Sequence, residues 1–499
     1  MFLFNGCSEG ETSSGPPVAA FKRRLPSADA FAVRKTQALS RSSRVGLAAA
    51  LSSIEESLEQ AVLHPAIASA SIDPAKNFLD AKADYDASAL LLLLRRMPKG
   101  GVLHTHGLAS GCFSRLVDLL QANQHCFIWQ GGGKDVVEGT LRCFATAAAA
   151  GGGWLPASQC DRDKLYRYVT LPPGLPSVKA CWEEFGKIWD RVLPLSCCAC
   201  FYFGRNGFLW SILEKQLEAN VMYLEIKEVL FHTWRRYDGS EVDDDEWTEL
   251  FRKTVEEFRA ENSIFLGARL VLTCHKNQSE EDVRKDFRRA VRMKERMPDF
   301  VAGFDLAGPE DLLNPIEFYA GVLEEEIALA LRRGIVLPLL LHAGETNVPE
   351  ASQIIDAIIL GCERIGHGFA LARHPGLVQE VLEAGISLEC CPISNQVLGY
   401  VPDLANHAIL GLLRAGVPVT LSPDDPAMWH YSDVSYDFAA AAKAWNLGLL
   451  ELKALARNSL AFSTLRGQEK DVALQAWEEL WDAWVKSELS TSVTANGKA

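Results

Sequence analysis

The sequence has no long apolar run, no excess of positive charge and no second CxxC pair beside its one dense cysteine cluster. A membrane-spanning helix needs about 20 consecutive apolar residues, and runs such as Leu90–Leu94 are far shorter. The net charge of -14 argues against a nucleic-acid-binding chain, because such a chain presents a basic face. The cluster Cys197–Cys200 lacks the second pair that a structural zinc site would need. We therefore predict a soluble protein with no transmembrane segment and no nucleic-acid partner.

The sequence does contain four polar clusters that each follow a short apolar segment. They are His104-Thr105-His106, His342-Ala343-Gly344-Glu345, Ile365-Gly366-His367-Gly368 and Ser422-Pro423-Asp424-Asp425. Residues two apart in a strand point the same way, so His104 and His106 can both offer an imidazole to one ion. A third histidine and a carboxylate from the other clusters would complete the ligand shell. Together the clusters predict a metal-hydrolase site.

Each cluster also has an ordinary structural explanation when it is taken alone. An HxH pair can lie on a surface by chance, His367 can be a hydrogen-bonded core histidine, and Asp424-Asp425 can cap a helix before Pro426. The recurrence of the clusters in order along the chain favours the functional interpretation.

Apolar and β-branched segments predict eight strands, most of them separated by helical stretches. The predicted strands are 101–103, 221–227, 268–273, 300–306, 337–341, 364–365, 386–391 and 417–421. Polar residues recur where these segments end. This alternation is typical of a (β/α)8 barrel of the TIM type, an α/β fold whose active site lies at the carboxyl ends of its strands.

The chain of 499 residues exceeds the roughly 250 residues of a typical barrel, so additional segments are expected. We predict the barrel over 86–485, with a loop-rich insertion over 111–180 after the first strand. An N-terminal helical extension is predicted over 1–85, its first part disordered, and a disordered tail over 486–499.

An apolar stripe in the N-terminal extension predicts a docking surface. The stripe consists of Leu47, Leu51, Ile54, Leu58 and Val62, at helical spacing. A free helix could not bury these side chains. The stripe therefore packs either on the chain's own barrel or on a second subunit, and both readings stay open.

The sequence leaves the compartment open. Met1–Gly10 has no apolar core long enough for a secretory signal, and the basic segment inside Glu11–Glu55 resembles an organelle transit peptide as much as the solvated face of a helix. In an oxidising compartment, Cys126, Cys143 and Cys160 could hold one disulfide.

Longer motifs carry a family resemblance. Met97–His106 resembles the first-strand signature of adenosine deaminases, and His342–Glu345 resembles their central motif. Val301–Gly308, Arg364–Leu371, Cys391–Leu398 and Ser422–Met428 are similar to motifs of the secreted branch of that family, the adenosine-deaminase-related growth factors. The resemblance covers the chain from about Asp73 to Val485.

The resemblance implies a zinc-dependent hydrolytic deaminase that converts adenosine and 2'-deoxyadenosine to inosine and deoxyinosine with release of ammonia. Matching positions make His104, His106, His342 and Asp424 the ligands of one Zn2+ per chain. Independently, imidazoles and one carboxylate suit zinc, and an open coordination position admits a water molecule with a lowered pKa.

The same matching assigns the remaining roles. Glu345 would protonate N1 of the purine while zinc-activated water attacks C6, and His367 would orient that water. Asp425 would contact N7 and the backbone N–H of Gly308 would contact N3. His275 and Trp182 match pocket positions. The family also implies a homodimer through the N-terminal helices and an extracellular location, with a cytoplasmic or organellar location as the alternative.

One departure bears on the substrate. An aspartate that contacts the ribose follows the HxH pair in the resembled branch, whereas this chain has Gly107. Glycine removes an acceptor and opens space, so a modified adenosine or an adenine nucleotide is an alternative substrate. An adenosine-binding, growth-factor-like signalling protein is an alternative of another class. The HxE and PCxxC motifs of cytidine-type zinc deaminases are absent.

Overall fold

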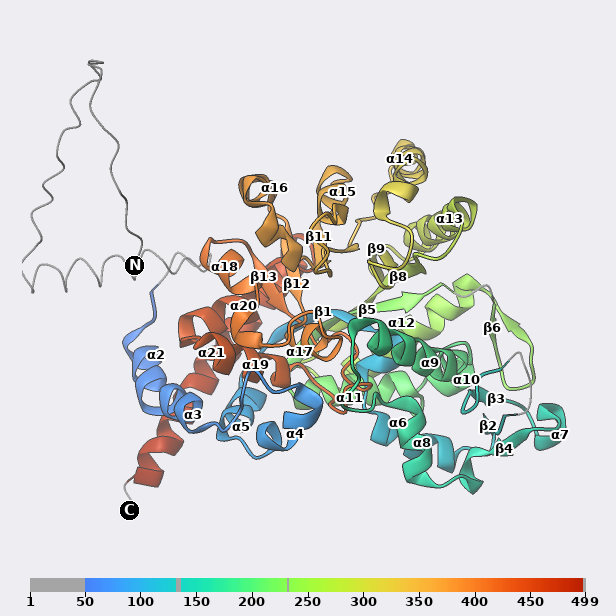
Figure 1. The fold of residues 1–499 in the computed structure, drawn as a ribbon, viewed down its shortest axis with the longest axis horizontal. Helices are drawn as coiled ribbons and strands as arrows, with labels where there is room; N and C mark the ends of the chain where they lie inside the picture. The colour runs from blue at the N-terminus through green and yellow to red at the C-terminus, as the bar shows by residue number, and fades with distance from the viewer. Residues whose placement is uncertain (1–49, 132–135, 231–232, 497–499) are drawn as a thin grey trace, which may run out of the picture. The chain divides into compact units, whose positions relative to one another are not determined.

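The computed structural model describes residues 50–131, 136–230 and 233–496. In these ranges, eight parallel strands form two four-stranded sheets, with the orders β1-β5-β8-β9 and β10-β11-β12-β13 (Figure 1). The strands are β1 (Gly100–His106), β5 (Val221–Val229), β8 (Gly267–His275), β9 (Val301–Ala307), β10 (His342–Ala343), β11 (Arg364–His367), β12 (Ser387–Cys390) and β13 (Val419–Leu421). Nearly all their residues are buried, as expected for parallel strands covered by helices.

The two sheets join at both edges, which closes the barrel. Phe304 pairs with Leu339 at one seam, and Thr105 pairs with Asp424 at the other, both in parallel orientation. The predicted (β/α)8 barrel is therefore confirmed, and the second seam lies beside the first polar cluster.

A helix lies between each strand and the next around the barrel. Several of these helices stand side by side outside the strands in Figure 1. The helices are α11 (Phe208–Glu218), α12 (Asp244–Glu261), α13 (Glu280–Arg296), α14 (Ile316–Arg332), α15 (Gln353–Ile359), α16 (Val378–Ala384), α18 (Ile409–Arg414) and α20 (Leu449–Ala461). Helix α20 packs so closely on β1 that a Cβ at Gly100 would lie 2.5 Å from the Ser459 hydroxyl, and φ of Gly100 is +73°. Only glycine fits this contact without strain.

The segment 337–341, predicted as a strand, pairs mainly through an isolated bridge at Leu339, and the regular strand β10 begins only at His342. Pro338 explains the difference, because proline has no backbone N–H to donate to the neighbouring strand. Its carbonyl still accepts a hydrogen bond from the Phe304 N–H at 2.8 Å, which keeps the segment in the barrel wall.

The described part of the N-terminal extension is helical and packs on the C-terminal helix. It contains α2 (Ser53–Leu58), a π-helical turn (Glu59–Leu63), α3 (His64–Ser69), α4 (Phe78–Asp86) and α5 (Ala89–Arg96). Ser52 and Glu55 form a capping box at the start of α2. Glu55 then accepts hydrogen bonds from Lys453 and from Trp481 on α21 (Gly467–Asn496), at 2.6 and 2.9 Å.

The packing of α2 on α21 shows where part of the apolar stripe of the extension lies. Leu58 is fully buried within the chain, whereas Ile54 is 44% exposed. Leu47 and the rest of residues 1–49 lie outside the described residues. The stripe therefore packs on its own chain at Leu58 and leaves Ile54 uncovered.

The C-terminal tail is helical to Asn496, so the prediction of a disordered tail from residue 486 is wrong over 486–496. The apolar face of this helix packs on the rest of the chain: Trp477 and Trp481 are fully buried, and Val485 is 2% exposed. None of the helices in the described ranges is long and apolar enough to cross a membrane.

The insertion after β1 contains more regular structure than the predicted loop-rich segment. A three-stranded antiparallel sheet has the order β3-β2-β4. Its elements and neighbours are α6 (Phe113–Ala122), β2 (Cys126–Trp129), β3 (Leu141–Cys143), α7 (Ala147–Ala150), β4 (Trp154–Pro156) and α8 (Arg162–Val169). Cys126 and Cys143 face each other across β2 and β3 as free thiols, with sulfurs 3.9 Å apart, and Cys160 lies outside that pair.

The other α-helices and strands of the described residues lie outside the eight-stranded barrel wall. They are α9 (Val178–Ser196), α10 (Ala199–Tyr202), β6 (Trp234–Arg235), β7 (Glu241–Val242), α17 (Pro392–Val397) and α19 (Ser435–Trp445).

Candidate metal centre and active site

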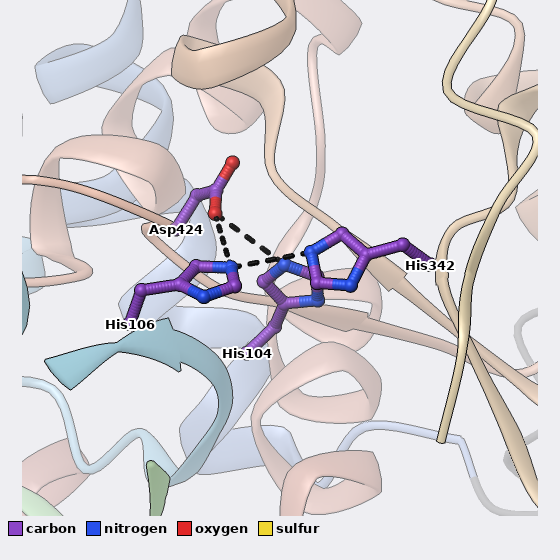
Figure 2. A group of neighbouring side chains, drawn as sticks. All are labelled: His104, His106, His342 and Asp424. Carbon is purple, nitrogen blue, oxygen red and sulfur yellow. Dashed lines mark hydrogen bonds and ion pairs between the residues drawn. The ribbon is translucent and has the colours of Figure 1, made fainter. Parts of the chain in front are cut away.

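Three histidines and an aspartate meet at the carboxyl ends of the barrel strands (Figure 2). His104 and His106 come from β1, His342 begins β10, and Asp424 follows β13. The His106 Nε2 atom lies 3.2 Å from the His342 Nε2 atom and 3.1 Å from Asp424 Oδ1. The strand alternation predicted for the HxH pair is thus what brings both imidazoles to one point.

The chemistry of these four side chains fits a metal ion. One donor atom from each lies within 4.8 Å of all the others. His104 Nε2 is buried without a hydrogen-bond partner, although it faces this centre. Three imidazoles and one carboxylate form a donor set that suits Zn2+. The four residues predicted from the sequence as metal ligands therefore do lie together in the folded chain.

Two buried carboxylates fix the orientation of the histidines. Glu389 on β12 accepts a hydrogen bond from His104 Nδ1 at 2.7 Å, and Asp305 on β9 lies 2.8 Å from His342 Nδ1. With Nδ1 held as the donor, Nε2 presents its lone pair to the centre. Sequence reasoning missed these two roles, although a carboxylate inside an apolar strand is a signal that could have indicated them.

A buried ion network compensates the charge of the orienting carboxylates. Lys227 lies 3.3 Å from Asp305 and 3.6 Å from Glu389, and Arg364 lies 2.7 Å from Glu389. Burial alone would raise the pKa of Glu389, but Lys227 and Arg364 outweigh it and hold the pKa below its usual range. Both carboxylates therefore stay ionised as hydrogen-bond acceptors for the histidines.

Glu345 lies beside the centre in a different electrostatic environment. Its Oε1 accepts a hydrogen bond from Asn395 Nδ2 at 3.2 Å and lies 3.4 Å from His367 Nδ1. Burial, together with the charges of Asp424 and Glu310, raises the pKa of Glu345 well above its usual range. A buried carboxyl that keeps its proton near neutral pH is suited to act as a general acid.

His367 lies between Glu345 and Asp424. Its Nε2 is buried with no hydrogen-bond partner and lies 3.9 Å from Asp424 Oδ2. Burial, with the neighbouring His104, lowers the pKa of His367 well below its usual range, so the imidazole is neutral. Both His367 and Asp424 have left-handed backbones, with φ of 61° and 62°. Such conformations are uncommon outside glycine and occur at functional sites.

A cavity of about 480 Å³ opens from this centre, a size typical of small-molecule sites. The residues predicted to bind substrate all line it: Asp425, Gly308, His275 and Trp182. Burial and the neighbouring Asp424 raise the pKa of Asp425 well above its usual range. Trp182 donates a hydrogen bond to the Tyr400 hydroxyl at 2.9 Å, which holds the indole at the wall. The residues predicted to bind substrate therefore line one cavity beside the four candidate metal ligands.

Comparison with known proteins adds an independent line of evidence. Residues 206–478 match the family model described as adenosine deaminase. Adenosine deaminase 2-A of Danio rerio is 31% identical over 436 residues, which make up 83% of this chain and 84% of that protein. Adenosine deaminase 2 of Homo sapiens is 30% identical over 442 residues, which make up 83% of each chain.

Solved structures agree on the fold. An amidohydrolase from Burkhoderia ambifaria with bound zinc superposes with a TM-score of 0.57 at 17% identity, over 81% of this chain and 96% of that one. An Arabidopsis N6-mAMP deaminase superposes with a TM-score of 0.55 at 18% identity, over 77% of this chain and 99% of that one. At this sequence identity, the structural similarity shows the barrel architecture alone. The substrate has to be inferred from the residues that line the cavity.

Proposed function

The chain belongs to the adenosine deaminase family of hydrolytic enzymes, and from this premise we propose that it deaminates adenosine and 2'-deoxyadenosine to inosine and deoxyinosine with the help of one zinc ion. One observation carries the proposal. A complete three-histidine, one-aspartate donor set lies at the mouth of the barrel, beside the buried Glu345, whose pKa is raised well above its usual range by burial and by Asp424.

His104, His106, His342 and Asp424 would hold the zinc. When bound there, zinc supplies Lewis-acid activation of a water molecule, whose pKa falls to about 7 at such sites. The protein's own contribution is to keep the ligands neutral and oriented. Burial lowers the pKa of His342 to about 3, so this imidazole offers a lone pair instead of a proton.

Glu345 would supply the proton that the purine needs. Attack at C6 puts electron density on N1, and a carboxylic acid beside N1 relieves that charge by protonating it. The raised pKa of Glu345 keeps the proton available, and the hydrogen bond from Asn395 holds the carboxyl group in place. His367 would orient the attacking water through its unpartnered Nε2.

Asp425 and Gly308 would hold the base in the orientation that this chemistry requires. Asp425 has one buried oxygen without a hydrogen-bond partner and a raised pKa, which suits a contact with N7. The backbone N–H of Gly308 would reach N3. Gly308 has φ +125°, and a Cβ there would lie 2.7 Å from Leu313 and 3.0 Å from His275, so glycine lets the base approach the backbone.

The cavity walls favour a nucleoside over a nucleotide. The wall residues include Asp190 and Glu228, and the single lysine among them, Lys227, is fully buried and paired with Asp305 and Glu389. A phosphate group needs arginine or lysine side chains that are free to bind it. The intact acid and ligand positions favour catalysis over a purely adenosine-binding signalling role.

The substrate is tested by ultraviolet absorbance of the zinc-loaded protein with adenosine, 2'-deoxyadenosine, AMP and N6-methyladenosine in parallel. We expect turnover of the first two and little turnover of AMP. Turnover of AMP or N6-methyladenosine alone would replace the proposed substrate by a nucleotide or a modified nucleoside. No turnover of any of them, with zinc bound, would favour the signalling role.

We also propose a homodimer through the N-terminal helices, and the exposed Ile54 on α2 supports it. An Ile54→Asp variant is expected to sediment as a monomer, because a charge would be buried in the interface. Ile359→Asp is the matched control, since Ile359 is 73% exposed on a helix of the barrel wall. A dimeric Ile54→Asp variant would contradict this interface. Secretion stays a prediction from the resemblance.

A further inference from the structure

Gly107 and Glu228 meet at one wall of the active-site cavity. Gly107 directly follows the ligand His106 at the end of β1, and Glu228 lies near the end of the adjacent strand β5. The register pairs His106 with Lys227, which brings the next residues of both strands side by side. A Cβ at Gly107 would lie 3.0 Å from Glu228 Oε2. The Glu228 carboxylate therefore lies against the position where a side chain at residue 107 would begin.

Within the described part of the chain, only one of the two carboxyl oxygens of Glu228 has a hydrogen-bond partner. Oε1 accepts a short hydrogen bond from the Tyr202 hydroxyl on α10. Oε2 has no hydrogen-bond partner among the described residues. Glu228 is 3% exposed and lines the same cavity as Glu345 and three of the four candidate metal ligands. Burial raises the pKa of the Glu228 carboxyl group to about 7, and the Tyr202 hydroxyl opposes that rise. Because Tyr202 occupies only Oε1, the carboxyl group can still accept a hydrogen bond from a ligand in the cavity.

We propose that Glu228 is a specificity-determining residue that accepts a hydrogen bond from a sugar hydroxyl of the substrate. This inference rests on the proposed function and extends it. The amino group of adenosine is at the reacting carbon, so the other hydrogen-bond donors of the nucleoside are its sugar hydroxyls. The carboxylate expected at residue 107 is thus supplied from the adjacent strand, and glycine at residue 107 leaves room for it.

The chemistry of the pair explains why the two positions depend on each other. An aspartate at residue 107 would place a second carboxylate against Glu228, and two carboxylates in one buried site repel each other. Removing Glu228 and restoring Asp at 107 would exchange one acceptor for the other. Aspartate tolerates the φ of +33° found at Gly107 better than most residues do.

The test compares kcat/KM for adenosine with values for 2'-, 3'- and 5'-deoxyadenosine. Glu228→Ala is expected to lower kcat/KM for adenosine by about 10- to 100-fold, the effect of losing a hydrogen bond to a buried carboxyl group. The analogue that lacks the bound hydroxyl should show no further loss in the variant. Glu228→Leu, which fills much of the same volume but has no hydrogen-bond acceptor, gives the same comparison if the alanine variant is unstable.

A rescue variant separates recognition from a structural role. Gly107→Asp combined with Glu228→Ala is expected to recover most of the activity on adenosine and to restore discrimination against one deoxy analogue. An equal loss on all four nucleosides would mean that Glu228 only holds Tyr202, and no loss on any would mean that it touches no substrate; either result overturns the inference alone. Wild-type protein that deaminates none of the four overturns the proposed function, and this inference with it.

Discussion

Replacing Glu345 by glutamine is expected to lower kcat on adenosine by a factor on the order of 10² to 10⁴, the usual contribution of a general acid. Glutamine has the shape of the protonated glutamic acid but cannot give a proton to N1. Its amide oxygen can still accept the hydrogen bond that Asn395 donates to Glu345 Oε1. The fold and the zinc content should therefore be unchanged, and steady-state kinetics beside metal analysis of the same sample checks this.

The matched control is Glu350→Gln, because Glu350 is an exposed residue five positions further along the chain. This variant should keep wild-type kinetics. Full activity in Glu345→Gln would rule out Glu345 as the proton donor. Loss of activity together with loss of zinc would mean that Glu345 supports the metal centre instead of the proton transfer.

The location of the site could be predicted from the sequence because a parallel barrel brings all its strand ends to one rim. His104, His342, His367 and Asp424 are far apart in the chain, but each follows an apolar segment, so their meeting follows from the strand pattern alone. The strand boundaries were less predictable. Pro338 interrupts the pairing of an apolar segment that otherwise has the composition of a strand.

The residues that support the site were harder to predict than those that form it. Glu389 and Asp305 lie within strands, and their roles depend on which neighbouring strand points a histidine at them. The role proposed for Glu228 depends on a further condition, because a Cβ at residue 107 of the adjacent strand would lie only 3.0 Å from Glu228 Oε2. Such roles follow from strand register, which the sequence of a single strand does not specify.

The insertion and the tail show a different limit. Runs of glycine in the insertion and the polar end of the chain both indicate irregular structure when read locally. Strands β2 and β3 are nevertheless regular, with Cys126 opposite Cys143 in the antiparallel register, and the last helix extends to Asn496. In β2 and β3, cross-strand pairing therefore overrides the local preference of the sequence.

Replacing His342 by alanine is expected to empty the metal centre and to lower activity by a factor on the order of 10³ or more. The variant removes one of four ligands and leaves Asp305 without the imidazole that it orients.

Glu389→Gln should have a smaller effect, weakening zinc binding by about 10- to 100-fold, because it leaves all four ligands in place and weakens only the orientation of His104. Competition with a chromophoric chelator measures both affinities without relying on turnover. Stoichiometric zinc in His342→Ala would show that the ligand set is wrong, and equal affinities in the two variants would show that orientation matters as much as ligation.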